Sequence, residues 1–326
     1  MPRQQDGGRP ASGERAGERD ATPEWWIASL VRLASERFGL TARPVAVEAN
    51  ASESRWRSGL LDIECDGELL SLFWKVGNRS SRDRVGRADG VGYEAAVYEH
   101  ALSHLGIGVA PLFGVVHDGE EVCLAIARLD RPLKASMAPQ PESLRSAVRT
   151  LASIHARAEA VVAGGPEGLQ PFDAWRSRDW LSSAIDLHGT EAFEDIGIHR
   201  ILEVFDELAA GPWTLVHGDC YPANVLVTQG VPVFVDWETA GIGPGELDLA
   251  ALTERWPDDV VADCLDRYCS ERWGGPARRS VVRRLAAARC FLYVRWLGGS
   301  PSLRRPSATE DAFRRLARVT GTLAPR

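Results

Sequence analysis

Residues 44–129 carry hydrophobic residues in short runs separated by turn residues. Three such runs are PVAVEA (44–49), GLLDIEC (59–65) and ELLSLFWKV (68–76), the last two joined at the turn DGE. Two more runs, PLFGVVH and EVCLAIARL, flank a second DGE over residues 111–129. Runs of this length, bounded by turn residues, predict five strands of a small antiparallel sheet.

Apolar residues at helical spacing appear beside these strands and then through the rest of the chain. EWWIASLVRLASERFGL (24–40) and VGYEAAVYEHALSHL (91–105) each predict a helix. Beyond about residue 130 we expect helices at 141–160, 172–187, 197–210, 246–255, 257–272, 277–297 and 308–322. Three short strands, TLV, VLV and VFV, interrupt this series between residues 214 and 235.

These patterns predict an α+β protein in two lobes, with the ligand site in the cleft between them. Residues 23–129 form the expected N-terminal lobe, a sheet with a helix, and residues 130–326 form the expected helical C-terminal lobe. Residues 1–22 are rich in Gly, Arg and Glu, with almost nothing to bury. They predict a disordered tail and not a secretory signal.

Composition excludes several classes of protein. Hydrophobic residues make up 44% of the 326 residues, enough for large cores, and no apolar run approaches the ~20 residues that span a bilayer. The net charge is −7, and no Lys/Arg block is long enough for a nucleic-acid footprint. The six cysteines include no Cys-x-x-Cys pair and predict small buried hydrophobes in a reduced, cytoplasmic setting. We expect a monomer or a homodimer.

Lysine is rare in this chain. Of the 38 basic residues only Lys75 and Lys134 are lysines. A chain with this bias keeps lysine where arginine would not serve as well. Lys75 ends the run LLSLFWK, and the end of a strand is where a sheet presents side chains to a cleft.

The polar residues of greatest interest lie in LVHGDCYPAN (215–224) and VFVDWE (233–238). Asp219 and Asn224 stand on a loop between two short strands, and Asp236 follows the second strand of a tight hairpin, which brings it back beside Asn224. Amide and carboxylate oxygens suit Mg²⁺, and a further carboxylate can accept a proton from a hydroxyl. Together with a lysine from the other lobe, these are the parts of phosphoryl transfer from ATP.

Over roughly residues 45–300 the sequence resembles the aminoglycoside phosphotransferase and choline kinase-like enzymes, relatives of the protein kinases. LVHGDCYPANVLV with VFVDWETAG is the specific part of the resemblance. Weaker matches, in the order of the family, are LFWKV, YEAAVYEHAL, LASIHA and GELDLAAL. The resemblance implies a protein-kinase-like two-lobed fold and an ATP- and Mg²⁺-dependent phosphotransferase acting on a hydroxyl of a small molecule.

The resemblance also implies a role for each matching residue of the catalytic segment. Asp219 would be the catalytic base that meets the acceptor hydroxyl. Asn224 and Asp236 would hold the Mg²⁺ that bridges the ATP phosphates. Asp248 would brace the catalytic loop, and the ring of His217 would hydrogen-bond to backbone near Asp236.

In the N-terminal lobe the resemblance implies which residues bind the nucleotide. Lys75 would contact the ATP phosphates and pair with Glu94, in preference to the competing Glu99. Ile126–Asp130, which includes Arg128, would be the hinge whose backbone groups read the adenine edge.

Two stretches depart from the family pattern. No G-x-G-x-x-G precedes Lys75, and NASESRWRSG (50–59) stands where the phosphate-covering loop is expected. GIGPGELDLA carries a longer link before Asp248 than the common GDPxxDLA. That length could shift Asp248, although not the metal ligands.

Other interpretations of single residues are weaker. Cys220 with His217 could suggest a thiol nucleophile or, with Asp219, a zinc site, but neighbours on a tight loop seldom converge and no second ligand cluster follows. His155 is expected to be a satisfied core histidine, and the arginines of 79–87 are expected on a solvated loop although they could bind phosphates. Some tryptophans of the helical lobe could stack on the ring or cation of an acceptor: Trp175, Trp180, Trp273 and Trp296.

The acceptor stays open at this point, among an aminoglycoside or other antibiotic, an amino alcohol, a sugar and a biosynthetic intermediate. A protein or peptide kinase is disfavoured because no APE follows Asp236. A pseudokinase that only binds a nucleotide or a partner is disfavoured because Lys75, Asp219, Asn224 and Asp236 are all retained.

Overall fold

Five strands near the start of the chain form one antiparallel sheet. They are β1 (Ala42–Ala49), β2 (Arg57–Cys65), β3 (Glu68–Asn78), β4 (Leu112–Asp118) and β5 (Glu121–Ala127). Their order across the sheet is β1-β2-β3-β5-β4, with every neighbouring pair antiparallel. All five predicted strands are present, and β3 runs past Lys75 to Asn78.

The computed structural model describes most of the chain. The described residues are 24–50, 55–82, 88–137, 140–165, 168–171, 174–299 and 306–323, without the side chains of 174–177. Several sequence predictions lie outside them: the tail at 1–22, residues 51–54 of the expected phosphate-covering loop, Arg84, Arg87 and the side chain of Trp175.

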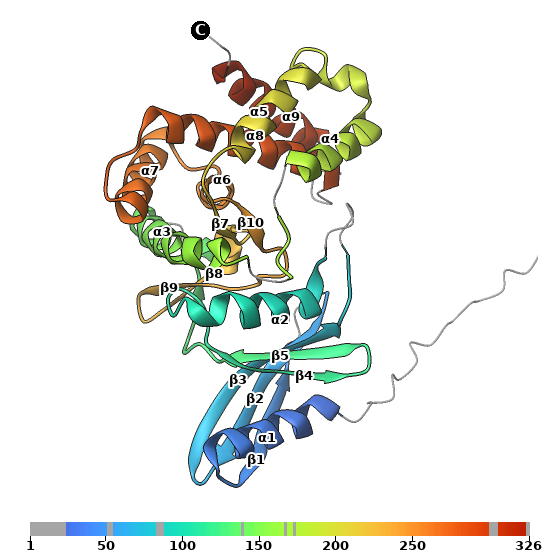
Figure 1. Ribbon diagram of the computed structural model, residues 1–326, viewed down its shortest axis with the longest axis vertical. Coiled ribbons are helices and arrows are strands. Elements are labelled where there is room, and N and C mark those ends of the chain that lie inside the picture. The colour runs from blue at the N-terminus through green and yellow to red at the C-terminus, as the bar shows by residue number, and fades with distance from the viewer. Residues whose placement is uncertain are drawn as a thin grey trace, which may run out of the picture.

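Two helices cover the two faces of the sheet. α1 (Trp25–Phe38) packs on one face, and α2 (Gly90–His100) lies on the other, between the sheet and the helical lobe (Figure 1). The alternation along β5 separates two cores, because successive side chains of a strand point to opposite faces. Cys123 and Ala125 join the core under α1, whereas Val122, Leu124 and Ile126 join the core that continues into the C-terminal lobe.

The C-terminal lobe consists mainly of helices, as predicted. They are α3 (Pro141–Ala163), α4 (Ala174–His188), α5 (Ile198–Ala209), α6 (Glu246–Leu252), α7 (Asp258–Trp273), α8 (Arg279–Gly299) and α9 (Pro306–Thr322). Short 3₁₀ helices occupy Leu102–His104, Ala135–Met137, Thr190–Phe193 and Pro222–Asn224. α8 lies at the centre of the lobe, in contact with α4, α5, α6 and α9. None of the described helices is both long and apolar enough to cross a bilayer.

Short strands in this lobe flank the segments LVHGDCYPAN and VFVDWE. They are β6 (Leu133–Lys134), β7 (Trp213–Val216), β8 (Val225–Thr228), β9 (Val231–Phe234) and β10 (Gly241–Pro244). β8 and β9 form the predicted hairpin, with β6 beside β8, while β10 pairs with β7. β10 was expected as a link. Its two glycines and one proline form no alternating hydrophobic pattern that would predict a strand. The segment becomes a strand because it pairs with the edge of β7.

All six cysteines are buried free thiols, which confirms their prediction as small hydrophobes. Cys65 and Cys123 lie in the core under α1. The others belong to the larger core of α2 and the C-terminal lobe: Cys220, Cys264, Cys269 and Cys290.

Candidate active site

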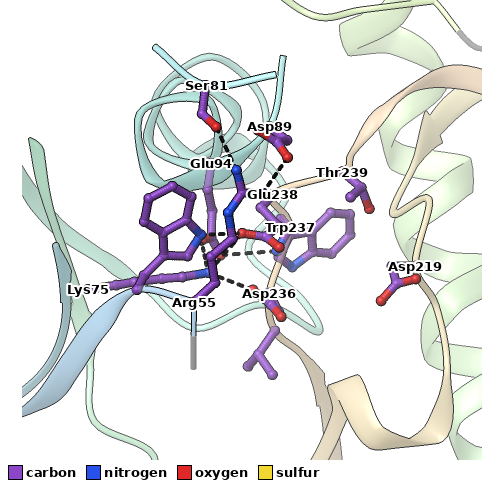
Figure 2. A network of polar contacts seen from close by, with 12 residues as sticks. Arg55, Lys75, Ser81, Asp89, Glu94, Asp219, Asp236, Trp237, Glu238 and Thr239 are labelled. Carbon is purple, nitrogen blue, oxygen red and sulfur yellow. Dashed lines mark hydrogen bonds and ion pairs between the residues drawn. The ribbon is translucent and has the colours of Figure 1, made fainter. Parts of the chain in front are cut away.

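Lys75 connects the two lobes. Its ammonium donates to Oε2 of Glu94 at 2.7 Å and to Oδ1 of Asp236 at 2.6 Å (Figure 2). The lysine comes from β3, the glutamate from α2, and the aspartate follows β9. The predicted pair with Glu94 is therefore present, whereas Glu99, the competing candidate, is exposed.

Three carboxylates surround this buried lysine, because Glu238 Oε2 also lies 3.6 Å from Nζ. Burial by itself lowers the pKa of Lys75, but Glu94, Asp236 and Glu238 outweigh it and raise the pKa above its ordinary value. Lys75 therefore carries a stable positive charge at neutral pH. Sequence reasoning missed Glu238, although its place two residues after Asp236 was visible in VFVDWE.

Glu94 also fixes the segment that carries Asp236. Its second oxygen, Oε1, accepts a 3.0 Å hydrogen bond from the backbone N–H of Trp237. Asp236 itself has φ 69°, a left-handed conformation that is uncommon for a residue other than glycine. Backbone strain of this kind persists only where surrounding contacts hold it. Here the residues on both sides of Asp236, Val235 and Trp237, are each hydrogen-bonded through their backbone.

Trp56, which precedes β2, reaches the same segment. Its indole N–H donates to Oε2 of Glu238 at 2.8 Å. The ring rests on Gly77 and Gly90, where an added Cβ would come within 2.6 Å of the indole at either position. The two glycines thus leave room for a tryptophan that holds Glu238.

Arg55 lies over the ring of this tryptophan. Its guanidinium lies 4.6 Å from the ring centroid of Trp56. It donates to Asp89 at 2.6 Å and to Ser81 at 2.9 Å (Figure 2). Asp89 and Ser81 belong to the segment that leads into α2. The residues before β2 are therefore joined both to the start of α2 and to the Asp236 segment.

The loop between β7 and β8, which carries Asp219 and Asn224, is held by Asp248. Its Oδ2 accepts the backbone N–H of His217 at 2.6 Å, and its Oδ1 accepts that of Gly218 at 2.9 Å. Gly218 has φ 78°, which a side chain would disfavour. The predicted brace is present, so the longer link before Asp248, partly folded as β10, does not displace it. The predicted bond of His217 is also confirmed, from Nε2 to the carbonyl of Val235 at 2.9 Å.

Asp248 is in turn contacted by His155. The histidine is fully buried on α3, with Nδ1 2.7 Å from the hydroxyl of Tyr268 and Nε2 3.2 Å from Asp248 Oδ2. Burial lowers the pKa of His155 from its ordinary value, against the opposing effect of Asp248. The prediction of a satisfied core histidine is confirmed.

The side chain of Asn224 is hydrogen-bonded to Asp219. Its Nδ2 donates to the carbonyl oxygen of Asp219 at 2.9 Å and to Oδ2 at 3.0 Å. Within the described part of the chain, Asn224 Oδ1 and Asp236 Oδ2 have no hydrogen bond. Both are hard oxygen donors of the kind that Mg²⁺ prefers.

The donor set fits Mg²⁺ better than a metal held by protein alone. No group of three or more His, Cys, Asp or Glu among the described residues is placed to hold an ion. Mg²⁺ commonly needs only one or two protein ligands, with waters and substrate phosphates completing its shell. Asn224 and Asp236 therefore fit a nucleotide-bound Mg²⁺. The zinc alternative on His217, Asp219 and Cys220 finds no support among the described residues.

Cys220 does not fit a nucleophile. It is fully buried, and burial raises the pKa of its thiol well above the ordinary value, with Asp248 and Asp219 adding to the effect. A thiolate is therefore not formed there at neutral pH.

Arg295 from α8 also contacts the loop, and sequence reasoning did not find it. Its Nη1 donates to the carbonyl of Gly218, and its Nη2 lies 3.6 Å from Asp219 Oδ1. The loop is thus held from α6 by Asp248 and from α8 by Arg295. No local motif marks Arg295, because the contact depends on how α8 packs.

A cleft of about 1060 Å³ opens beside Asp219. Aromatic residues line much of it: Trp180, Tyr221, Trp256 and Trp296. Two of the four tryptophans singled out in the sequence are among them, Trp180 and Trp296. Trp273 is not, and its ring lies against Arg272 at 4.6 Å instead.

The expected hinge follows β5. Ile126 lies inside the sheet, opposite Phe73 of β3 and Leu112 of β4. The backbone N–H of Arg128 donates to the carbonyl of Ser71 at 3.0 Å, so an adenine contact from this residue would have to use its carbonyl. The role of Ile126 and Arg128 in nucleotide binding stays a prediction.

Comparisons with known proteins agree with this arrangement. The model of the phosphotransferase enzyme family, APH, matches residues 94–285, more than half of the 326 residues. No curated protein matches the sequence.

Solved structures match over most of their length. Choline kinase LicA from Streptococcus pneumoniae superimposes with a TM-score of 0.58 at 14% identity, covering 89% of this chain and 98% of that one. A thermostable mutant of aminoglycoside phosphotransferase APH(4)-Ia, in a ternary complex with ADP and hygromycin B, gives 0.52 at 17% identity, covering 91% and 100%. Amicoumacin kinase, in complex with AMP-PNP, Ca²⁺ and Ami, gives 0.53 at 11%, covering 92% and 96%. At these identities the likeness shows the fold, an α+β kinase-like architecture.

Proposed function

Because this chain belongs to the phosphotransferase enzyme family, we propose that it transfers the γ-phosphate of ATP to a hydroxyl group of a small molecule. One observation carries the proposal. The buried ammonium of Lys75 is held 2.6 Å from Asp236 at the junction of the lobes, and Asp219 lines a cleft of about 1060 Å³ next to it. Lys75, a cation that could bind phosphates, and Asp219, a carboxylate that could accept the proton of a hydroxyl, thus lie in one region and come from separate elements.

The nucleotide would be held mainly by charge. Lys75 would contact the ATP phosphates, with Glu94 keeping its ammonium in place. Asn224 and Asp236 would hold Mg²⁺ through oxygens that carry no hydrogen bond in the described part of the chain. Mg²⁺ bound there would neutralise the negative charge of the phosphates.

Asp219 would act on the acceptor. Its carboxylate would take the proton of the acceptor hydroxyl while the hydroxyl oxygen forms a bond to the γ-phosphorus and the bond from that phosphorus to the ADP oxygen breaks. Asn224 and Arg295 both contact Asp219 and would fix its orientation. Most of the rate enhancement would come from positioning and from charge stabilisation.

The solved relatives support a small-molecule acceptor, since one holds hygromycin B with ADP and another is a choline kinase. We extend this class of acceptor to the present chain as part of the proposal. We place the enzyme in the cytoplasm, as a monomer or homodimer, on the sequence evidence alone.

The test is an ADP-release assay with MgATP across a panel of hydroxylated acceptors, antibiotics included. The Asp219→Asn variant keeps the shape of the side chain and removes the proton acceptor. Its turnover should fall by ~10²–10⁴, the usual range for a positioned acid–base group, while MgATP binding changes little. Asp118→Asn, in the β4–β5 hairpin, is the control and should keep full activity. Unchanged turnover in Asp219→Asn would contradict the proposal, and loss of MgATP binding would make Asp219 a metal ligand instead.

A further inference from the structure

Among the residues that the structure describes, the cleft beside Asp219 is lined by two carboxylates, Asp219 and Glu254, and each already faces a cation. Its charged lining residues, among those the structure describes, are Asp219, Glu254, Arg255 and Arg295. Glu254 is neutralised in place, because Arg315 lies 2.8 Å from its Oε1 and the hydroxyl of Tyr293 donates to its Oε2 at 3.1 Å. Its side chain is only 6% exposed.

Asp219 is also faced by a cation, with Arg295 Nη2 at 3.6 Å. An acceptor with several ammonium groups would need a carboxylate for each group that leaves water, because an unpaired charge is costly to bury. The cleft would instead place such an acceptor next to two guanidinium groups. A polycationic acceptor therefore does not fit.

Arg255 is the one charged lining residue with no ion pair or hydrogen bond to other described residues. It is exposed, lies between this cleft and a neighbouring one, and lines both. Its backbone has φ 68°, just after α6, where glycine is favoured and a side chain is disfavoured. A guanidinium presents five donors in a planar fork that matches a carboxylate or phosphate group.

Three of the four aromatic lining residues are already engaged with an arginine or with each other. The face of Trp180 is taken by Arg295, 6.0 Å from the ring centroid. Tyr221 and Trp296 stack on each other at 6.3 Å, and the indole N–H of Trp296 donates to the hydroxyl of Tyr221 at 2.5 Å. These rings therefore present mostly apolar surface to an occupant.

We propose that the acceptor is a hydroxylated acid with a flat apolar body, whose anionic group, a carboxylate or a phosphate, is bound by Arg255 while its hydroxyl lies at Asp219. This assignment rests on the proposed function, because it concerns the acceptor of that reaction. It selects against aminoglycosides and choline-like amino alcohols among the acceptors left open by the sequence.

Four matched probes test the charge preference. Mandelate, mandelamide and 2-amino-1-phenylethanol share a phenyl ring and a benzylic hydroxyl and carry a carboxylate, a neutral amide and an ammonium group. 2-Hydroxy-2-phenylethylphosphonate carries a doubly charged acid and separates a phosphate-like group from a carboxylate. Binding is measured by ligand-observed NMR with the MgATP-free enzyme, and turnover is measured separately by ADP release.

We expect at least one of the two acids to bind about 10- to 100-fold more tightly than the ammonium compound, the range for a hydrogen bond to a charged group. Arg255→Gln should remove this preference and leave mandelamide binding unchanged. Arg255→Gly should also remove it, although it relieves the left-handed backbone and should not lower the melting temperature. Arg279→Gln, an arginine that lines neither cleft, is the control for loss of a positive charge and should retain the preference.

The proposal is overturned if the ammonium compound binds as well as both acids, if none of the four probes binds, or if Arg255→Gln leaves the ranking unchanged. These results come from binding alone. Absence of ADP release with every acceptor, in an enzyme that binds acids through Arg255, would instead count against phosphotransfer. The two proposals can therefore fail separately.

Discussion

The indole N–H of Trp56 donates a 2.8 Å hydrogen bond to Oε2 of Glu238, 182 residues further along the chain. That carboxylate lies 3.6 Å from the ammonium of Lys75 and two residues after Asp236. Through this bond the segment before β2 fixes one of the three carboxylates around the lysine. Trp56 is thus a positioning residue for the proposed phosphate site.

Trp56→Phe should therefore weaken the use of MgATP without unfolding the protein. Phenylalanine keeps an aromatic ring over Gly77 and Gly90 but cannot donate to Glu238, whose carboxylate is then free to move toward Lys75. We expect kcat/KM for MgATP to fall by roughly tenfold, the effect of one hydrogen bond to a charged group.

Trp25→Phe is the matched control for Trp56→Phe. Trp25 also donates its indole N–H to a glutamate, Glu121 Oε2 at 3.0 Å, but away from Lys75. Its loss should leave kcat/KM unchanged. Equal effects of the two substitutions would show that the Trp56 bond has only a structural role.

Lys75→Arg should impair activity although it keeps the charge. The Lys75 side chain is buried, with its Nζ within 2.7 Å of Glu94 and Asp236, a space shaped for a compact ammonium. A planar guanidinium would displace these carboxylates, and a misplacement of about 1 Å at a phosphoryl-transfer site costs roughly 10²-fold in rate. Steady-state kinetics with varied MgATP measures the loss. Normal ATP use by the variant would show that the rarity of lysine in this chain has no bearing on the site.

Asn224→Ala and Asp236→Ala should each abolish Mg²⁺-dependent turnover while the protein stays folded. Each truncation removes an oxygen donor of the proposed metal site, and the pair of Lys75 with Glu94 remains in Asp236→Ala. Binding of Mn²⁺ in the presence of ADP, followed by electron paramagnetic resonance, should weaken in parallel. Asp118→Ala serves as the exposed control. Near-wild-type turnover in Asp236→Ala would refute its role as a metal ligand.

The pH dependence of stability should depend on His155. Its pKa in the folded protein is lowered by burial, so below about pH 6.5 the unfolded chain takes up a proton that the native state refuses. Its contribution to stability is therefore present above this pH and is lost as the pH falls, with a slope of at most about 1.4 kcal/mol per pH unit.

Urea unfolding at several values between pH 7.5 and pH 5.5, a range set around the ordinary histidine pKa of about 6.5, measures this dependence. His155→Gln can still bond to Tyr268 and Asp248 but does not titrate, so its stability should fall less steeply with acidification than that of the wild type. His199→Gln, at an exposed histidine, should keep the wild-type slope. Identical slopes for the wild type and His155→Gln would mean that His155 does not cause the pH dependence of stability.

Sequence patterns predicted most of the elements and the residues that lie on them with a clear motif. The short apolar run ELLSLFWKV and the turn DGE predicted β3 and its neighbours, and VFVDWE contains the Asp236 that meets Lys75. The brace from Asp248 was predicted through the resemblance, in spite of the longer link before it.

Contacts that depend on packing were not predictable in the same way. Arg295 meets Asp219 only because α8 lies at the centre of its lobe, and Trp56 meets Glu238 only because two glycines leave room for its ring. β10 was missed because a strand made of Gly-Ile-Gly-Pro gains its stability from the partner strand and not from its own residues.

Because all six free cysteines are buried, their reaction with a thiol reagent can be used to follow the unfolding of each lobe separately. Burial raises the pKa of Cys123 in β5 to about 12 and that of Cys290 in α8 to about 12, so both thiols resist alkylation while their surroundings stay packed. Brief exposure to N-ethylmaleimide followed by peptide mass spectrometry would therefore time the opening of the sheet through Cys123 and of the helical lobe through Cys290. Such timing needs no introduced label, and it can be repeated with a bound nucleotide to learn which lobe a ligand holds closed.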